Sequence, residues 1–345
     1  MARARPAAFR RKKSMISPFF VREAYGTGRT LALPAADVGE DMRKLLPVLL
    51  NRTSGDSDAR EIPDRIREAF RSAGADADVR IAGDGEQFSA LARQAAAGDS
   101  AALVAAGGDG SVGSVAAVLA GSGKPLGVLP LGTLNHFAKD LGVPLDLDGA
   151  VRTVVEGRVA SIDVGEVNGR IFVNNSSLGL YPRIVHQREQ QREKLGWGKW
   201  PAFVWATLHA LHRHRSVDVV LVADGQEIRR RTPFVFVGNN FYEMEGFDIG
   251  TRERLDRGEL SAYLAPGAKP VDFLFFGLRA LIGRLRGAPG FEVLRATELR
   301  IETRGDRARV ATDGEISSVS TPLRYRVLPG ALAVIVPRAT IEEAP

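Results

Sequence analysis

The feature of this 345-residue sequence that most constrains its fold is a strand, glycine turn and helix start that occurs twice between residues 101 and 144. In the first copy an apolar run at 103–106 enters Gly-Gly-Asp-Gly-Ser at 107–111, and a helix pattern follows at 112–119. The second copy covers 126–138. Strands and helices that alternate in this way predict a parallel sheet with a ligand at the carboxyl ends of its strands.

Two such turns at neighbouring strand ends form a natural phosphate cradle. Glycine has no Cβ and adopts a positive φ at little cost, so consecutive backbone N–H groups can converge on an anion beside the positive end of a helix. A carboxylate beside a phosphate is unfavourable unless a divalent cation or water lies between them, so Asp109 indicates Mg²⁺-nucleotide. A turn without a ligand would show the same glycines. The residues of the two turns predicted to bind nucleotide are Gly107, Gly108, Asp109, Gly110, Ser111, Gly132, Thr133 and Asn135.

The remaining elements of the first half continue the alternation. Strands are expected at 46–50 and 77–81, and helices at 62–70, 86–97 and 148–156. We therefore predict an α/β nucleotide-binding domain at 41–157, preceded by a basic, disordered arm at 1–40.

After residue 157 the pattern changes to short strands with hairpin signals. Asn168-Gly169 and Asp224-Gly225 are dipeptides typical of two-residue hairpin loops. Later strands are expected at 217–223, 226–231, 234–237, 260–264, 292–303, 309–312, 324–328 and 332–336. These predict an antiparallel sandwich domain at 158–345, with last strands that could return to the first domain.

Composition excludes some classes of protein and leaves others open. The absence of cysteine excludes disulfides and thiolate zinc sites. The net charge of +6 suits an anionic partner such as nucleotide, nucleic acid or an acidic membrane face. No apolar run reaches 18 residues, so no membrane span is expected. Localisation is predicted to be cytoplasmic and peripheral at the inner membrane surface.

Helical inserts at 183–199, 201–215 and 271–286 combine aromatic and leucine side chains with arginines. This combination suits a helix at a lipid interface, but helices packed on the sandwich with a solvated basic face would look the same. The histidines at 209, 212 and 214 have no carboxylate at ligand spacing and indicate surface residues rather than a metal site.

The sequence from Gly107 to Ser111, followed by that from Leu129 to Pro144, resembles the diacylglycerol kinase catalytic-domain family, which includes bacterial lipid kinases and the sphingosine and ceramide kinases. More distantly it is similar to the NAD kinases, where the likeness stops at the first glycine turn. The resemblance implies ATP and Mg²⁺. It also implies that the domain at 158–345 binds a lipid substrate. In the small polar turn after the first strand it implies nucleotide contacts by Asn51, Ser54 and Gly55, with Arg52 in place of the family's proline, and Thr53 is a further small polar candidate there.

The candidate acceptor side of the site is Asp313-Gly314-Glu315. Residues two apart on an extended chain share a face, so both carboxylates are expected to point into one cleft. A hairpin turn with solvated acids is the alternative. The resemblance implies that Glu315 is the general base, with Asp313 and Asp109 beside it. It also implies a structural cation at an acid-Gly turn, where this chain has Arg257, so a metal near Asp256 stays open.

The predicted function is transfer of the γ-phosphate of ATP to a lipid hydroxyl, with diacylglycerol the expected acceptor and phosphatidic acid the product. A long-chain base such as sphingosine is the alternative acceptor. A non-catalytic nucleotide-binding regulator is the alternative of another class. No basic-aromatic module for nucleic acid is present. A lipid substrate and transient membrane contact are the expected partners, and homodimerisation stays open.

Overall fold

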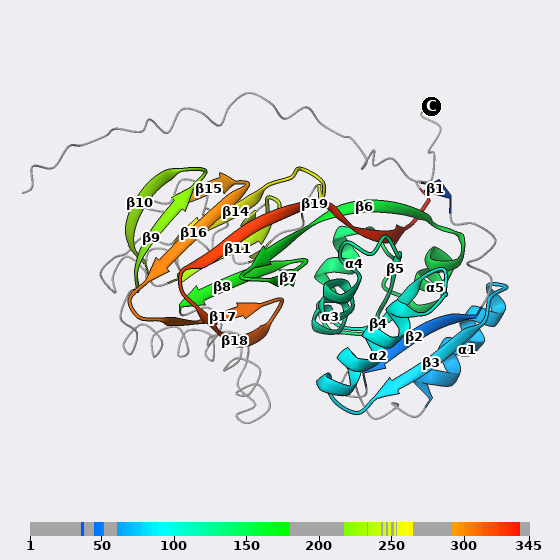
Figure 1. Ribbon diagram of the computed structural model, residues 1–345. Coiled ribbons are helices and arrows are strands. Elements are labelled where there is room, and N and C mark those ends of the chain that lie inside the picture. The colour runs from blue at the N-terminus through cyan, green and yellow to red at the C-terminus, as the bar shows by residue number, and fades with distance from the viewer. Residues whose placement is uncertain are drawn as a thin grey trace, which may run out of the picture. The chain divides into compact units, whose positions relative to one another are not determined.

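Figure 1 shows the computed structural model of the chain. The described residues are 45–51, 61–179, 217–232, 234–242, 252, 254–264 and 292–338, with the backbone of three short strands, β1 (Ala36–Asp37), β12 (Met244–Glu245) and β13 (Asp248–Ile249). The three predicted helical inserts, the three histidines and Thr53, Ser54 and Gly55 lie outside these residues.

The first half alternates strands and helices, as predicted. Its strands are β2 (Leu46–Asn51), β3 (Ala77–Ala82), β4 (Leu103–Gly107) and β5 (Leu126–Pro130). Its helices are α1 (Ile62–Ser72), α2 (Gly85–Ala97), α3 (Asp109–Leu119), α4 (His136–Asp140) and α5 (Leu147–Glu156). The strands are parallel in the order β5-β4-β2-β3. Strands β4 and β5 are buried throughout, because helices cover both faces of a parallel sheet.

The handedness of the crossovers decides which face each helix covers. The chain steps from β2 outward to β3 through α1 and then back past β2 to β4 through α2, so these right-handed crossovers put α1 and α2 on opposite faces. Helix α5 packs against α1, and α3 packs against α2. Because α3 follows β4 and α4 follows β5, the starts of both helices lie at the carboxyl edge of the parallel strands.

The second half is antiparallel. Its strands are β6 (Arg158–Val167), β7 (Arg170–Phe172), β8 (Asn175–Gly179), β9 (Val217–Ala223), β10 (Gln226–Thr232), β11 (Phe234–Asn239), β14 (Leu260–Leu264), β15 (Glu292–Ala296), β16 (Glu298–Thr303), β17 (Arg307–Thr312), β18 (Glu315–Ser320) and β19 (Leu323–Val336). One sheet has the order β15-β14-β11-β8-β17-β18. The other strands extend the parallel sheet in the order β10-β9-β16-β19-β5, with β6 beside β19.

Apolar side chains from the two sheets form one core. Leu221 of β9 and Ile301 of β16 come from the sheet that continues the parallel strands. Val235, Val237 and Val310 come from the sheet that contains β11 and β17, and all five are buried in the same cluster. This layered core confirms the predicted fold class, an α/β domain with a parallel sheet followed by an antiparallel sandwich.

Two strand predictions were wrong in their limits. The expected strand at 292–303 breaks at Thr297, because β15 pairs with β14 in one sheet while β16 pairs with β9 in the other. The expected strands at 324–328 and 332–336 form one strand, β19, with a register shift against β6. At its end Val334 pairs in parallel with Leu126 of β5, so backbone hydrogen bonding continues from the sandwich into the α/β half.

Candidate active site

The two glycine turns touch each other. A Cβ on Gly132 would lie 2.4 Å from the Cα of Gly108, and the N–H of Leu131 donates to the carbonyl of Gly107 at 3.1 Å. Positive φ angles, which the sequence led us to expect, are found at none of Gly107, Gly108, Gly110 and Gly132. Close backbone approach is therefore the reason for glycine at 108 and 132.

Asn135 gives the second turn its shape. Its φ is 50°, in the left-handed region that asparagine tolerates better than most residues. The buried side chain accepts from the N–H of Gly132 at 3.0 Å and donates to the carbonyls of Gly132 and Pro130 at 2.8 and 3.3 Å. The neighbouring Thr133 is exposed. The amide group of Asn135 thus holds the turn backbone, while Thr133 stands at the surface of the turn.

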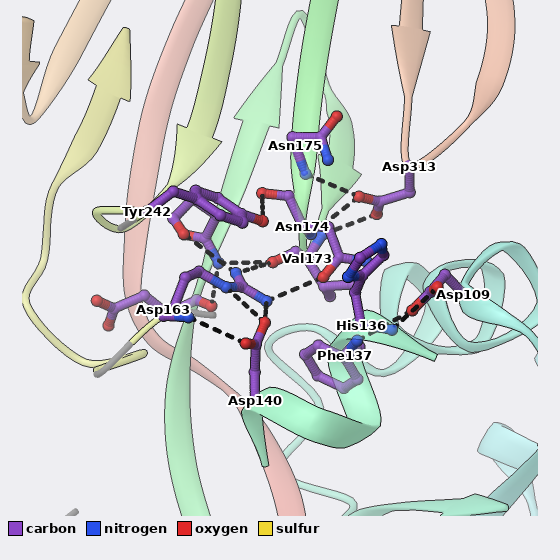
Figure 2. Close-up of polar contacts among 12 residues, drawn as sticks. Asp109, His136, Phe137, Asp140, Asp163, Val173, Asn174, Asn175, Tyr242 and Asp313 are labelled. Carbon is purple, nitrogen blue, oxygen red and sulfur yellow. Dashed lines mark hydrogen bonds and ion pairs between the residues drawn. The ribbon is translucent and has the colours of Figure 1, made fainter. Parts of the chain in front are cut away.

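Asp109 ties the first turn to the second (Figure 2). Its carboxylate accepts from the N–H groups of His136 and Phe137, at 3.1 and 3.0 Å. These are the first two N–H groups of α4, which have no partner within the helix. Each carboxylate oxygen keeps a free lone pair, because a carboxylate offers about four acceptor positions.

The described residues contain no group of three metal-ligating side chains. Mg²⁺ in nucleotide sites is usually held by one or two carboxylates, the phosphates and water. Asp109 fits that kind of site, in which the ion arrives with the nucleotide.

Asp313 and Gly314 form a two-residue hairpin loop between β17 and β18. Their φ angles are 47° and 90°, and Thr312 pairs with Glu315 across the loop. The prediction that Asp313 and Glu315 share one face of an extended strand was therefore wrong, because the chain reverses between them. Glu315 is exposed at the start of β18.

The Asp313 carboxylate is held by backbone N–H groups about 140 residues earlier in the chain. Oδ1 accepts from Asn174 and Asn175 at 2.8 and 3.0 Å, and Oδ2 accepts from Val173 at 2.8 Å (Figure 2). Burial raises the pKa of Asp313 from 3.8 to about 6, although these hydrogen bonds and the Arg252 guanidinium act to lower it. The Asp313 carboxyl group is thus mostly ionised at neutral pH, and it becomes protonated as the pH falls below about 6.

Asp313 also lies against helix α3. A Cβ on Gly113 would be 3.1 Å from Asp313 Oδ2 and 3.4 Å from its Cβ. Gly113 is one turn after Asp109 on the same face of α3, about 6 Å along the helix axis. The Asp-Gly turn and the first glycine turn, predicted separately from the sequence, therefore meet on one face of α3.

The other predicted residues take varied positions. Ser111 is buried in the first turn of α3, and Asn51 is half-buried at the end of β2. At the acid-Gly turn where the sequence left a structural cation open, Asp256 pairs with Arg254 at 2.7 Å. The N–H of Gly258 in the same turn donates to Asp163 at 2.6 Å. Asp256 thus pairs with a neighbouring arginine, and the backbone of this acid-Gly turn bonds to Asp163.

Sequence reasoning missed two contributors to the site. Gly113 is the last glycine of a G-x-G-x-x-G spacing that begins at Gly108, and that spacing was the available signal. Arg252, which is buried and bonded to Asp140 of α4, had no local signal. Its surroundings come from three separate parts of the chain.

Comparison with known proteins shows the family of the chain. Residues 46–167 match the family model of the diacylglycerol kinase catalytic domain, and residues 185–336 match that of the YegS C-terminal NAD kinase beta sandwich-like domain. A protein of Pseudomonas aeruginosa strain PAO1, named "Probable lipid kinase YegS-like", is 30% identical over 303 residues, which cover 86% of this chain and 95% of that protein. The chain belongs to the diacylglycerol kinase catalytic-domain family. It is accordingly a lipid kinase, with ATP as the phosphate donor that this family implies.

Two further relatives of this lipid kinase were found. A diacylglycerol kinase of Staphylococcus aureus strain MRSA252 is 29% identical over 213 residues, which cover 60% of this chain and 65% of that protein. The crystal structure of a diacylglycerol kinase from Bacillus anthracis str. Sterne has a TM-score of 0.67 at 22% identity, covering 87% of this chain and 99% of that chain. That likeness supports the fold. Within the described residues, no helix is long and apolar enough to span a membrane.

Proposed function

We propose that this lipid kinase transfers the γ-phosphate of ATP to the hydroxyl of diacylglycerol, giving phosphatidic acid. The observation that carries the proposal is the position of Asp313 against Gly113 of α3. It puts a carboxylate with a raised pKa against the helix that starts at the first glycine turn. Phosphoryl transfer to an alcohol needs both, a bound triphosphate and an acceptor for the hydroxyl proton.

We assign the proton-accepting role to Asp313. Its pKa of about 6 leaves it mostly ionised at neutral pH, yet far more basic than an ordinary aspartate. The three backbone donors orient the carboxylate toward α3 and leave one lone pair of Oδ2 for the substrate hydroxyl. Glu315, exposed two residues later, stays a prediction for this role.

The glycine turns would hold the phosphates. Their backbone N–H groups and the start of α3 form an anion site without side chains in the way, as the contact of Gly108 with Gly132 allows. Asp109 would hold Mg²⁺, directly or through water. The ion supplies positive charge that stabilises the transferring phosphoryl group. Asp109 additionally keeps α4 in place through His136 and Phe137.

Support for a lipid acceptor comes from the relatives' names and from the surface of the site. Staphylococcus aureus relatives are named diacylglycerol kinase. Large apolar side chains are exposed in the second glycine turn and directly after the Asp-Gly turn, at Leu134 and Ile316, with 57% and 47% of their surface accessible. We propose that these side chains contact acyl chains when the enzyme works transiently at a membrane surface.

The test is a phosphorylation assay with a panel of lipids. Purified protein is incubated with γ-labelled ATP and mixed micelles that contain diacylglycerol, sphingosine or ceramide, with and without Mg²⁺. We expect labelled phosphatidic acid, dependent on Mg²⁺, at a rate well above that of the other lipids. Preferential labelling of sphingosine would replace diacylglycerol as the acceptor. Binding of ATP without labelling of any lipid would instead favour a regulator.

The assignment of the base is tested with Glu315→Gln beside Asp313→Asn. We expect Glu315→Gln to keep kcat within roughly tenfold of the wild type, and Asp313→Asn to lose about a hundredfold or more. Both variants should bind ATP as the wild type does. The reverse order of the two effects would give the role to Glu315.

A further inference from the structure

We infer that Arg252 is a positioning residue for the phosphoryl transfer: it joins helix α4, behind the nucleotide turns, to the backbone segment 173–175 that holds Asp313. The inference rests on the proposed function, because it assigns a task to Asp313. Arg252 itself contacts neither turn.

The first half of the connection is an ion pair with α4. Asp140 is the last residue of α4, and both side chains are almost completely buried. Asp140 Oδ1 accepts from the backbone N–H of Arg252 at 3.0 Å, and Oδ2 accepts from Nε at 2.9 Å and lies 2.7 Å from Nη2. One carboxylate oxygen thus lies between two guanidinium nitrogens while the other takes the backbone N–H, so Asp140 holds both the side chain and the main chain of Arg252. The other end of the same short helix is capped by Asp109.

The second half of the connection reaches the Asp313 cradle. Nη1 of Arg252 donates to the carbonyls of Val173 and Asn239 at 2.6 and 3.1 Å, and Nη2 donates to Asn174 Oδ1 at 2.9 Å. The N–H groups of Val173 and Asn174 in turn donate to Asp313. Figure 2 shows the two ends of this arrangement, with Asp109 bonded to His136 and Phe137 at the start of α4 and Asp313 bonded to the segment 173–175. The guanidinium thus holds the peptide between Val173 and Asn174, whose N–H donates to Asp313, while Asn239 and Tyr242 bond the carbonyls of the same segment.

Lysine could not replace arginine here. The site uses donors in three directions in one plane, which matches the rigid fork of a guanidinium, whereas an ammonium group offers three donors from one point. The Tyr242 ring adds a face for the guanidinium, whose Cζ lies 5.0 Å from the ring centroid. Tyr242 also donates its hydroxyl to the carbonyl of Asn174 at 2.9 Å, so the aromatic ring supports the same segment.

If Arg252 only held α4 against the sandwich, its ion pair with Asp140 would be sufficient. Its hydrogen bonds to Val173 and Asn174, which carry the N–H donors to Asp313, would then have no role. The charged and titratable groups that face Arg252 are Asp140 from α4, Tyr242 after β11, and Asp313 from the β17–β18 turn. Loss of Arg252 should therefore change Asp313 in two measurable ways. The peptide that carries the Asn174 N–H loses a donor that holds it, and a positive charge that lowers the pKa of Asp313 is removed.

The test uses Arg252→Lys and the double variant Asp140→Asn with Arg252→Met, which leaves no unpaired carboxylate behind. Arg254→Met is the matched control, because Arg254 lies two residues further on in an exposed ion pair with Asp256. For each protein kcat, KM for ATP and the pH profile are measured with diacylglycerol as acceptor. The pKa of Asp313 is measured without substrate by ¹³C NMR of labelled aspartate carboxyls, with Asp313→Asn assigning the signal.

We expect kcat to fall by about a hundredfold in the double variant, since misplacement of a reacting group by about 1 Å has effects of that size. KM for ATP should stay within roughly threefold of the wild type, and the Asp313 midpoint should rise by about one pH unit. Arg252→Lys should lose about tenfold in kcat with a smaller midpoint change. Arg254→Met should match the wild type in every measurement.

An unchanged Asp313 midpoint in a folded variant would overturn the inference, as would full activity of Arg252→Lys. If the double variant does not fold, Arg252→Lys decides alone by the same two measurements. If the wild type phosphorylates no lipid, the proposed function fails, but the NMR midpoints still report whether Arg252 controls Asp313.

Discussion

Two Asp-Gly turns of this protein have the same local structure and different surroundings. Asp224-Gly225 joins β9 to β10 with φ angles of 44° and 84°, and Asp313-Gly314 joins β17 to β18 with φ angles of 47° and 90°. In both turns the aspartate accepts from backbone N–H groups of another segment, Thr297 and Glu298 in the first case and residues 173–175 in the second. The dipeptide alone therefore explains the hairpin in both places.

The difference lies in what surrounds each carboxylate. Asp224 is exposed and secures the point at which β15 and β16 part into different sheets. Asp313 is partly buried against α3 and has a pKa raised to about 6 by burial. The aspartate of such a turn becomes a candidate catalytic group only when another element packs on it and buries it. The local sequence around the turn does not show whether that happens.

The largest expected difference between the turns is in activity. Asp313→Asn should lower kcat by about 10²- to 10⁴-fold, the range in which a general base contributes. Asp224→Asn, the matched control, should keep the kcat of the wild type. Steady-state assays with ATP and diacylglycerol measure both kcat values. Equal losses of kcat in the two variants would show that Asp313 has no special role in catalysis.

The next largest effect is a dependence of activity on pH. Because Asp313 must be ionised to accept a proton, kcat/KM should be level above its pKa of about 6 and fall about tenfold for each pH unit below it. Asp224→Asn should show the same profile as the wild type. A profile measured from pH 5 to 8 with no acid limb near 6 would contradict the role of Asp313.

A smaller effect is expected in stability. The pKa of Asp313 is higher in the folded chain, about 6, than its usual value of 3.8, so the folded state holds this proton more tightly. Its contribution to the free energy of unfolding is full below pH 4 and is lost as pH rises through 6. Relative to Asp313→Asn, the wild type should lose on the order of 1–3 kcal/mol between pH 4 and 7 in urea unfolding. A constant difference over that range would refute the raised pKa.

The smallest effect concerns the glycines of the two turns. A Cβ on either Gly225 or Gly314 meets no atom within 4 Å, so the positive φ is the one source of strain in both. Gly225→Ala and Gly314→Ala should each lower the free energy of unfolding by about 1–2 kcal/mol. Denaturant unfolding measures both values, and clearly unequal losses would show that the turns differ locally after all.

Much of the fold was predictable because local chemistry specifies it. Apolar runs that lead into the two glycine turns predicted β4 and β5. Asp146, in front of an amphipathic segment, caps α5 through the N–H of Gly149. The division of 292–303 at Thr297 was not predictable, because an apolar alternation does not say to which sheet a strand belongs. The sequence left open that the last strands return to the first domain, but it did not say that β19 pairs with β5.

For the site, the sequence by itself determined the two glycine turns and their aspartate, since these depend on backbone freedom and neighbours a few residues away. It offered the Asp-Gly hairpin only as the alternative to an extended strand. Only the tertiary structure decided that Asp313 meets Gly113, that Glu315 faces solvent, and that Arg252 connects α4 to the Asp313 cradle. The physical reason is desolvation. Burial is what turns an ordinary carboxylate into a base with a pKa near 6 and what makes a guanidinium depend on every acceptor around it, and burial is a property of distant segments brought together.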